Sequence, residues 1–360
     1  MKRSAPQLQV TEQFNQFIKA SSSGRRLTPS GKRITKGTII NYQYVFRLIN
    51  EFEKKTGSVL RIQLLHRASM RTIQREKNYW NRFFTKFSAF LYNEKKYHDN
   101  YVSNVFKIIK TFFNYLQKEK GFVIGNYHRS FRIPLQLSAP VVLLPEQLNF
   151  LITNKDFENK LNPYLKRAKD IFVFGCTVSL RFSDLMALKK NNIVLYNSEY
   201  LLVVFTKKTG TEIKIPLPPY LLEIIHKYRR KAGRYLLPRL SSTNLNIQIK
   251  KLINAAGLDH TLPKTISNRG RMIELKTASG EAWPFYKHIT AHTMRRTAIT
   301  TLLILGVPET VVRKVSGHAP GSKEFYKYVS IAQQYLNKEV KNAYQKLLEI
   351  PPFLPLKNTA

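Results

Sequence analysis

Apolar residues recur at intervals of three and four along the first 120 positions of the chain, the spacing that places side chains on one face of a helix. Aromatic residues are interleaved with basic ones in these segments. We interpret them as core packing between helices, with stacking on nucleic-acid bases as the lesser alternative. The pattern predicts four helices, over residues 10–20, 36–55, 71–94 and 100–120.

The pattern changes beyond a weakly periodic, proline-bearing segment at 126–142. Pro145 and Glu146 suit the first turn of a new helix, and a further helix is predicted over 164–174. Short runs rich in β-branched and aromatic residues then predict a small sheet, and helical spacing returns after Pro218. The predicted strands cover residues 193–196, 200–206 and 212–216.

These elements predict a mainly α (α+β) fold with two domains, as the length also favours. The first domain is helical, and the second is mixed but mostly helical, with a small three-stranded antiparallel sheet. A proline-rich tail follows, which cannot continue a helix. The predicted boundaries are 1–128 for the first domain, 129–142 for the linker, 143–350 for the second domain and 351–360 for the tail.

The net charge of the chain limits the classes of partner that it can bind. Lys and Arg number 60 against 22 Asp and Glu, giving a formal net charge of +38. The excess is even, with 26 basic and 7 acidic residues in 1–140 (+19) and 34 and 15 in 141–360 (+19). Both halves therefore look suited to a polyanion, although a solvated basic surface without a partner is the simpler alternative. No run of about 18 apolar residues and no hydrophobic signal core occurs, so we expect a nucleic acid, not a membrane, and a cytoplasmic, nucleoid-associated location.

The single cysteine and the histidines predict neither a disulfide nor a metal site. Cys176 lies in an apolar run, where it is best explained as a small buried hydrophobe of a protein in a reducing compartment. The eight histidines form no cluster at ligand spacing with Cys or carboxylates. We therefore expect no metal and no other cofactor.

Arg181 and Lys208 are the first candidates for chemistry. Arg181 stands at a break between two helices, where Ser183 is predicted as the N-cap of the second; such a place suits an anion. A structural contact between Arg181 and Asp184 is the alternative. Lys208 lies on a predicted hairpin turn with Gly210, from which its ammonium projects beyond the sheet, although exposed hairpin lysines usually have no specific role.

His292 and Arg295 lie three apart at the start of a predicted helix capped by Thr290 or Thr293, so they share one face and could clamp an oxyanion. The same stretch also has the outline of a helix-turn-helix, with a turn at Gly306, Pro308 as the first residue of the second helix and an end at Gly317. A DNA-binding regulator without catalysis would need only that outline and the positive charge.

His318 follows Gly317 at a predicted helix end, and Tyr326 and Tyr328 come soon after. Tyrosine is a weak nucleophile at its usual pKa near 10, so it needs cations around the group that it attacks and a partner for its proton. Arg181, Lys208, His292, Arg295 and His318 would supply both for a phosphodiester.

In this order, the motifs SLRFSDLMAL, KKTG, HTMRR and SGH followed by a late tyrosine resemble the tyrosine recombinase (phage integrase) family, over about 143–345. The resemblance implies a helical DNA-clamping, SAM-like core-binding domain before the catalytic domain. It also implies a site-specific DNA recombinase that forms a 3′-phosphotyrosyl bond, without nucleotide or metal. The implied roles are phosphate binding for Arg181 and Arg295, protonation of the leaving 5′ oxygen for Lys208, acid/base assistance for His292 and a hydrogen bond to a non-bridging oxygen for His318.

The chain departs from the family pattern at the nucleophile. The family's usual spacing from the last histidine falls between Tyr326, at eight residues, and Tyr328, at ten. The sequence FYKYVSIA resembles the version found in integrases of mobile elements, so we favour Tyr328 and keep Tyr326 as the alternative.

The resemblance also implies partners. We expect double-stranded DNA, a homo-tetramer on two DNA sites and, for some tasks, accessory DNA-bending proteins, with integration or excision of a mobile element as the biological role. A type IB topoisomerase shares the chemistry and is the alternative enzyme. Apolar residues at helical spacing in 336–348 predict a segment that docks either on a neighbouring protomer or on its own core.

Overall fold

The computed structural model describes residues 7–134, 140–206, 210, 212–319 and 321–349. The chain divides into two compact units. The first contains residues 1–138 together with 265–275, and the second contains 139–264 together with 276–360. Lys208 and the tail 351–360 lie outside the described residues.

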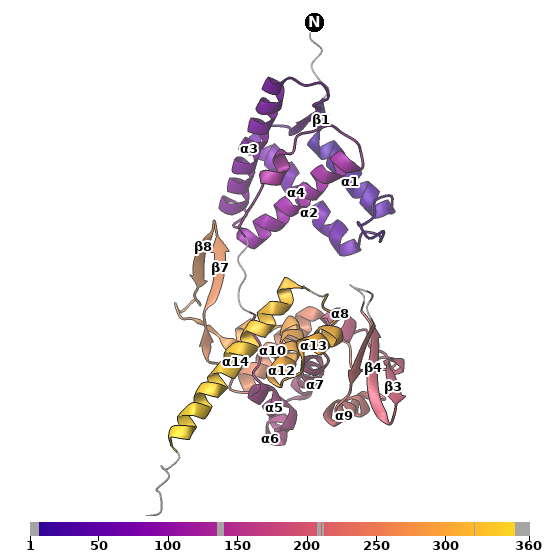
Figure 1. Ribbon diagram of the computed structural model, residues 1–360, viewed down its shortest axis with the longest axis vertical. Helices are drawn as coiled ribbons and strands as arrows, with labels where there is room; N and C mark the ends of the chain where they lie inside the picture. The colour runs from indigo at the N-terminus through magenta and orange to yellow at the C-terminus, as the bar shows by residue number, and fades with distance from the viewer. Residues whose placement is uncertain (1–6, 135–139, 207–209, 211, 320, 350–360) are drawn as a thin grey trace, which may run out of the picture. The chain divides into compact units, whose positions relative to one another are not determined.

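The first unit is a helical bundle, and all four predicted helices are confirmed with ends within three residues of those expected (Figure 1). Thr35 and Ser69 cap the second and third helices, since their side-chain oxygens accept hydrogen bonds from backbone N–H groups of the first turn. These caps explain where the two helices begin. The core is dominated by aromatic rings such as Phe14, Phe87 and Trp80, all at most 1% exposed. The interleaved aromatics are therefore packing residues. The elements are α1 (Val10–Ser23), α2 (Lys36–Thr56), α3 (Met70–Asn93) and α4 (Asp99–Lys118), with a 3₁₀ turn at Tyr127–Ser130 and the short pair β1 (Gln7–Gln9) and β2 (Arg61–Gln63).

A hairpin from far along the chain completes the first unit. It consists of β7 (Lys264–Asn268) and β8 (Arg271–Leu275). The backbone N–H groups of Arg269 and Gly270 donate to the buried carboxylate of Asp99 at 2.7 and 2.8 Å, and the Ser267 hydroxyl donates to the same carboxylate. Tyr92 adds a fourth bond, at 2.6 Å. Burial would raise the pKa of Asp99, but these bonds outweigh it and hold the pKa below its usual value.

The prediction that helical spacing returns after Pro218 is wrong at this hairpin and at a second strand pair, β6 (Thr261–Leu262) with β9 (Trp283–Pro284). The physical reason is local. Arg269 and Gly270 have φ values of +53° and +78°, a left-handed turn that closes two strands, and the flanking residues are largely exposed. Short exposed strands lack the strict alternation of apolar and polar residues from which a strand is predicted.

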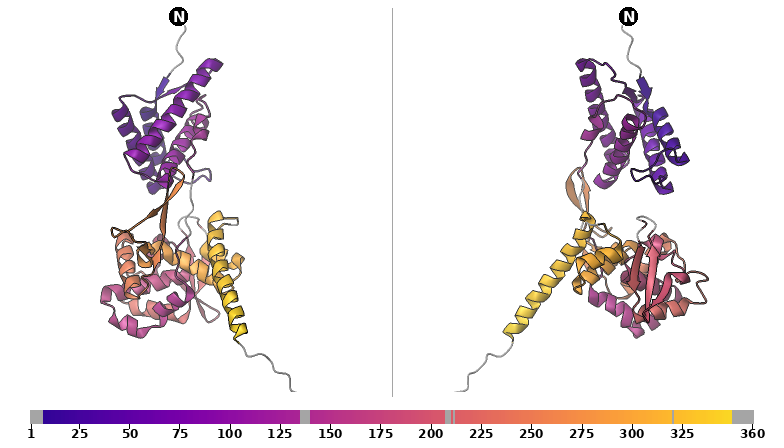
Figure 2. Two further views of the ribbon diagram at one scale, coloured as in Figure 1. Left: turned by 90° about the vertical axis from the view of Figure 1, so that its left-hand side faces the viewer. Right: turned by 45° about the vertical axis from the view of Figure 1, so that its right-hand side comes forward.

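The second unit is built around the buried helix α7 (Pro163–Val178), which packs against α12 (Ala291–Ile304) and α10 (Ser242–Ala255). Gly175 permits the close approach of α7 and α12, because a Cβ at this position would come within 2.5 Å of the Met294 sulfur. A long last helix, α14, extends away from the unit at its C-terminal end (Figure 2). The other helices are α5 (Pro145–Thr153), α6 (Lys155–Lys160), α8 (Phe182–Leu185), α9 (Pro219–Tyr228), α11 (Phe285–His288), α13 (Glu309–Ser316) and α14 (Lys323–Leu348), with a 3₁₀ turn at Lys190–Asn192.

The predicted three-stranded antiparallel sheet is confirmed in the second unit, in the order β3 (Ile193–Tyr196), β4 (Glu199–Phe205) and β5 (Glu212–Pro216). Leu202 and Ile213 carry its buried face into the core, at 0% and 1% exposed. The fold is thus mainly α with small antiparallel sheets, as predicted. None of the helices in the described part of the chain has both the length and the apolar character needed to cross a membrane.

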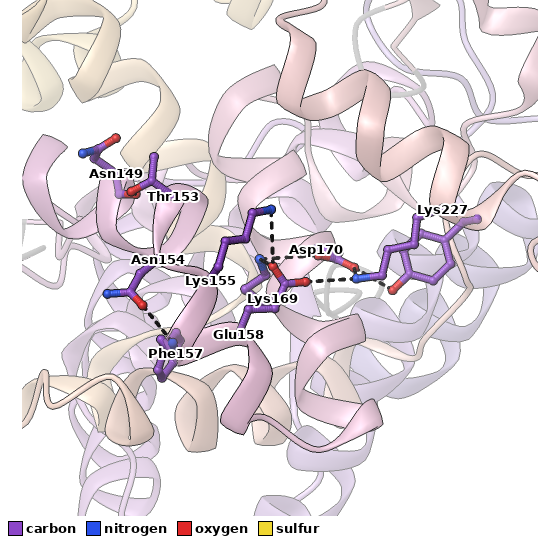
Figure 3. Close-up of polar contacts among 10 residues, drawn as sticks. Asn149, Thr153, Asn154, Lys155, Phe157, Glu158, Lys169, Asp170 and Lys227 are labelled. Atoms are coloured by element: carbon purple, nitrogen blue, oxygen red, sulfur yellow. Dashed lines mark hydrogen bonds and ion pairs between the residues drawn. The ribbon is translucent and has the colours of Figure 1, made fainter.

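A compact ionic network ties α6, α7 and α9 together (Figure 3). Glu158 accepts from Lys169 at 2.9 Å and from Lys227 at 3.2 Å. Asp170 pairs with Lys227 at 2.7 Å and also accepts from the Tyr228 hydroxyl at 2.8 Å. We call these residues, Glu158, Lys169, Asp170, Lys227 and Tyr228, the paired network.

Candidate active site

Arg295 lies at the centre of the candidate site, on the first turns of α12. Thr290, one of the two predicted caps, is the N-cap residue of this helix, and in a capping box its N–H donates to Thr293 Oγ1 at 3.0 Å. Arg295 is 3% exposed. Its Nη1 donates to the carbonyl oxygen of Ser179 at 2.8 Å, which fixes the guanidinium.

Ser179 is a site residue that the sequence did not indicate. It ends α7 in the left-handed region, at φ +52°, a conformation that residues other than Gly, Asn and Asp seldom adopt. That turn presents the Ser179 carbonyl to Arg295, and the Ser179 hydroxyl donates to the Val315 carbonyl at 3.1 Å. Ser179 thereby links α7, α12 and α13. A left-handed serine has no sequence signature.

His318 meets Arg295 from the end of α13. Gly317 makes this possible, because it ends the helix at φ +62° as predicted, and a Cβ there would come within 3.1 Å of Ile213. The two ring nitrogens of His318 lie 3.3 and 3.4 Å from Arg295 Nη2. Ser316 Oγ lies 2.8 Å from His318 Nδ1 and donates to the Val312 carbonyl at 2.6 Å. Since that bond uses the hydroxyl proton, Ser316 accepts from Nδ1–H, and the Nε2 lone pair of neutral His318 is left toward the guanidinium.

Arg181 stands at the N-cap position of α8, so the prediction of Ser183 as the N-cap is wrong. Ser183 is inside this one-turn helix, and the preceding left-handed Ser179 shifts the helix start toward Arg181. The Arg181 Nη1 atom is buried and has no hydrogen-bond partner among the described residues. A buried guanidinium nitrogen without a partner is costly, which makes it a place for an incoming acceptor.

The shifted pKa values of these groups indicate that they lie within electrostatic reach of one another. Burial lowers the pKa of Arg295 to about 10, and the nearby charge of Arg181 contributes. Burial, followed by Arg295 and Arg181, lowers the pKa of His318 to about 4. The pKa of His292 is also lowered, by partial burial and then by Arg296, Arg295 and Arg181. Asp184 and Glu324 act in the opposite direction on members of this group without reversing any of the shifts. We call Arg181, His292, Arg295 and His318 the cationic cluster.

The two candidate tyrosines have different surroundings. Tyr328 is 6% exposed, and its ring centroid lies 6.0 Å from that of His318. Its charge would also raise the pKa of Arg295, so its hydroxyl is within electrostatic reach of that guanidinium. Tyr326 is 54% exposed, with its ring 5.1 Å from the guanidinium carbon of Arg313. The structure brings Tyr328 to the cationic cluster and leaves Tyr326 at the surface.

The remaining predictions concern Lys208 and the helix-turn-helix. Lys208 itself is outside the described residues, but Thr206, two positions earlier, lies beside Gly317 of the site. The helix-turn-helix outline is present in α12 and α13, with Gly306 at φ +83° in the turn. Pro308 is the N-cap of α13 and not its first residue, a shift of one position. α12, the first helix of the outline, is largely buried, with Met294, Ala298 and Ile299 at most 1% exposed. α13, the second helix, which reads DNA in this motif, is exposed at residues 309–311 and at Lys314, so the outline by itself does not decide between a regulator and an enzyme.

An arrangement of two guanidinium groups, two imidazoles and a buried phenol suits phosphoryl transfer, in which catalysis is largely positioning and charge stabilisation. Of the residues that the structure describes, no group of three or more His, Cys, Asp or Glu is placed to hold a metal ion.

Comparison with known proteins agrees with this chemistry. The model of the phage integrase family matches residues 142–335, more than half of the chain. No curated protein matches the sequence. Among solved structures, a lambda integrase dimer bound to a COC′ core site has a TM-score of 0.52 and 16% identity, over 91% of this chain and 95% of that one.

Two further structures are similar. The XerH site-specific recombinase bound to difH has a TM-score of 0.56 and 15% identity, over 91% of this chain and 97% of that one. The Tn1549 transposon integrase in complex with circular intermediate DNA has a TM-score of 0.55 and 14% identity, over 89% of this chain and 94% of that one. At these identities the structures establish the shared fold, and the family match establishes descent. The chain belongs to the phage integrase family, the tyrosine site-specific recombinases.

Proposed function

We propose that this recombinase cuts and rejoins duplex DNA through a 3′-phosphotyrosyl intermediate, with Tyr328 as the nucleophile. The observation that carries the proposal is the burial of Tyr328 against His318 within reach of Arg295, while Tyr326 is exposed. A phenol needs such a cationic surrounding to attack a phosphodiester near neutral pH.

We assign the roles that the family resemblance implies, and the positions of the described groups support those of the two arginines. Arg181 and Arg295 would bind the non-bridging oxygens of the scissile phosphate. Arg181 has a buried nitrogen without a partner in the described part of the chain, and Arg295 is held by the Ser179 carbonyl. The Tyr328 oxygen attacks phosphorus and the bond from phosphorus to the 5′ oxygen breaks. The phenol proton passes to His292, and Lys208 gives a proton to the leaving 5′ oxygen.

Rejoining reverses this step with the 5′-hydroxyl of another strand. The energy of the broken bond is kept in the phosphotyrosyl linkage, so the balance closes without a nucleotide. The phosphate also changes His318. Its negative charge opposes the burial and the neighbouring arginines that together keep the pKa of His318 near 4, so His318 becomes protonated at Nε2 on binding and donates to a non-bridging oxygen.

We infer that the protein acts on two DNA sites as a homo-tetramer. Lambda integrase has been solved as a tetramer bound to a Holliday junction. In this chain the C-terminal half of α14 has an exposed apolar stripe at helical spacing, which suits docking on a neighbouring protomer more than packing on its own core. The stripe consists of Val340, Tyr344, Leu347 and Leu348, which are 50–86% exposed.

We also infer that the DNA partner is the reason for the high charge of both halves of the chain, +38 in total. Integration or excision of a mobile element is the task that fits the FYKYVSIA sequence around Tyr328, and the similar Tn1549 integrase is itself a transposon enzyme.

A library of nicked duplexes with randomised sequence tests the reaction. A nick close to the cleavage point lets the short 5′-hydroxyl fragment diffuse away, so the covalent adduct accumulates and survives detergent. We expect adducts from the parent and from Tyr326→Phe, joined through a DNA 3′-phosphate, and none from Tyr328→Phe. Adducts from Tyr328→Phe but not from Tyr326→Phe would refute the nucleophile assignment.

The same assay separates the two alternatives. A helix-turn-helix regulator would give salt-sensitive binding without any adduct. A type IB topoisomerase would relax supercoiled DNA whatever its sequence, whereas a site-specific recombinase should leave a plasmid without the selected site unchanged.

A further inference from the structure

We propose that Arg313 is a positioning residue, which holds the tyrosine-bearing helix α14 against α13 by stacking its guanidinium on Phe325. This inference rests on the proposed function, since it assigns Arg313 a part in aligning Tyr328.

The contact is close and specific. The guanidinium carbon of Arg313 lies 4.0 Å from the centroid of the Phe325 ring and 5.1 Å from that of Tyr326. Glu309, one turn earlier on α13, accepts from Arg313 Nη2 at 3.3 Å. The Arg313 side chain is 13% exposed, whereas the next residue, Lys314, is at the surface. Arg313 therefore points toward α14 instead of toward solvent.

Phe325 transmits this contact to the site. It is 0% exposed and belongs to a small apolar cluster with Ile299, Val312 and Tyr328. Its ring meets the His318 ring edge-on, with the centroids 5.5 Å apart, and the Tyr328 ring at 6.3 Å. A shift of Phe325 would thus displace both the histidine and the proposed nucleophile.

The start of α14 needs such a support. Ser322, its N-cap residue, makes no side-chain cap hydrogen bond among the described residues. The helix begins directly after a turn in which Gly321 has φ +72°. A planar guanidinium can lie flat on an aromatic ring, while a lysine ammonium at the same place cannot reproduce that stacking.

Arg313 has a second, separable effect through its charge. Of the residues that the structure describes, those whose charges act on His318 are Arg295 from α12, Arg181 at the N-cap of α8, Arg313 from α13 and Glu324 from α14. Removing the charge of Arg313 should therefore raise the pKa of His318, while replacing Arg313 with lysine should not. The stacking and the charge can be told apart on this basis.

The test compares Arg313→Lys and Arg313→Ala with the parent and with Lys314→Ala, which removes a charge from the exposed side of the same helix. The rate of adduct formation is measured in single turnover with saturating nicked duplex. Both Arg313 variants should lose about 10- to 100-fold in rate, as misplacement of reacting groups costs, with little change in DNA affinity. Lys314→Ala should keep the rate and only weaken binding. In Arg313→Ala alone, the alkaline limb of the rate profile, where the phosphate-bound His318 loses its proton, should move to higher pH.

A double-mutant cycle with Phe325→Leu completes the design. Once the ring is gone, Arg313→Lys should cost little more, because the stacking has already been lost. Equal rates for Arg313→Lys and the parent, or full additivity with Phe325→Leu, would overturn the proposal. If the parent itself forms no adduct, the proposed function fails instead. The Arg313→Lys arm keeps the test decisive should Arg313→Ala not fold.

Discussion

The paired network and the cationic cluster are two groups of charged and ionisable side chains in the same compact unit, each with a buried centre, Asp170 in the first and Arg295 in the second. They differ in how their charges are matched. In the paired network each carboxylate is matched by a lysine (Figure 3). Burial would raise the pKa of Glu158, but Lys169 and Lys227 outweigh it and lower the pKa to about 2. In the cationic cluster, burial and neighbouring arginines act together, so the pKa values of Arg295 and His318 fall to about 10 and 4.

The charges of the paired network are neutralised within the chain and stabilise the fold, whereas those of the cationic cluster are not neutralised and can bind a ligand. A buried pair whose hydrogen bonds are satisfied is complete within the chain. A buried cation whose neighbours repel it is less stable than in water, and the addition of an anion lowers its free energy. The electrostatics of the cationic cluster therefore favour the binding of an anion.

The largest effect should come from Arg295→Gln, which removes the central charge and keeps much of the shape. Adduct formation should fall by about 10²- to 10³-fold or more, the usual cost of losing a donor to the transition state. The melting temperature should stay the same or rise, since a repelled cation has been removed. Single-turnover cleavage measures the rate of adduct formation, and thermal unfolding measures the melting temperature. A large drop in melting temperature would mean that Arg295 is a structural residue like those of the paired network.

Asp170→Ala should show the opposite behaviour. It leaves Lys169 and Lys227 short of a partner and removes the acceptor of the Tyr228 hydroxyl. We expect a loss of about 3 kcal/mol in the free energy of unfolding, the scale for breaking a buried ion pair. The rate of adduct formation by the folded protein should be unchanged. Denaturant titration and single-turnover cleavage at low temperature measure the two quantities, and a selective loss of rate would contradict the division between the clusters.

Some of this contrast could be predicted from the sequence. Spacing along a helix placed His292 and Arg295 on one turn, and the glycine before His318 marked a helix end. These are local signals that survive folding. Ser179 could not be found, because a left-handed conformation is imposed by the helices around it. The four bonds to Asp99 from Tyr92 and the β7–β8 hairpin also join residues up to 171 positions apart, for which a single sequence gives no pairing rule.

Acid should reveal the two clusters at different pH. His318 has a lowered pKa, so the unfolded chain binds its proton first, and the stability that it contributes is lost as pH falls from about 6.5 to 4. Glu158 also has a lowered pKa, and its contribution is lost between about 4.5 and 2.

The effects should be modest because both side chains keep some contact with solvent. Urea unfolding at a series of pH values, with His318→Asn and Glu158→Gln, should show each variant flattening only its own window. The pKa of His128 in the first unit is also lowered to about 4, so His128 contributes equally to the pH dependence of unfolding in both variants. A change in the wrong window would show that the shifts have other origins.

The smallest effect is the binding of a simple anion. Inorganic phosphate should occupy the place left for the scissile group, between Arg181 Nη1 and the Arg295 guanidinium. At ten times its dissociation constant it would stabilise the protein by about 1.4 kcal/mol, which is a measurable rise in melting temperature. The rise should be lost in Arg295→Gln and kept in Asp170→Ala, after allowance for the lower starting point. Because ionic strength alone also affects a protein of charge +38, chloride at matched ionic strength is the control. Equal shifts with both salts, or an undiminished phosphate shift in Arg295→Gln, would mean that the cationic cluster holds no specific anion and does not differ from the surface in this respect.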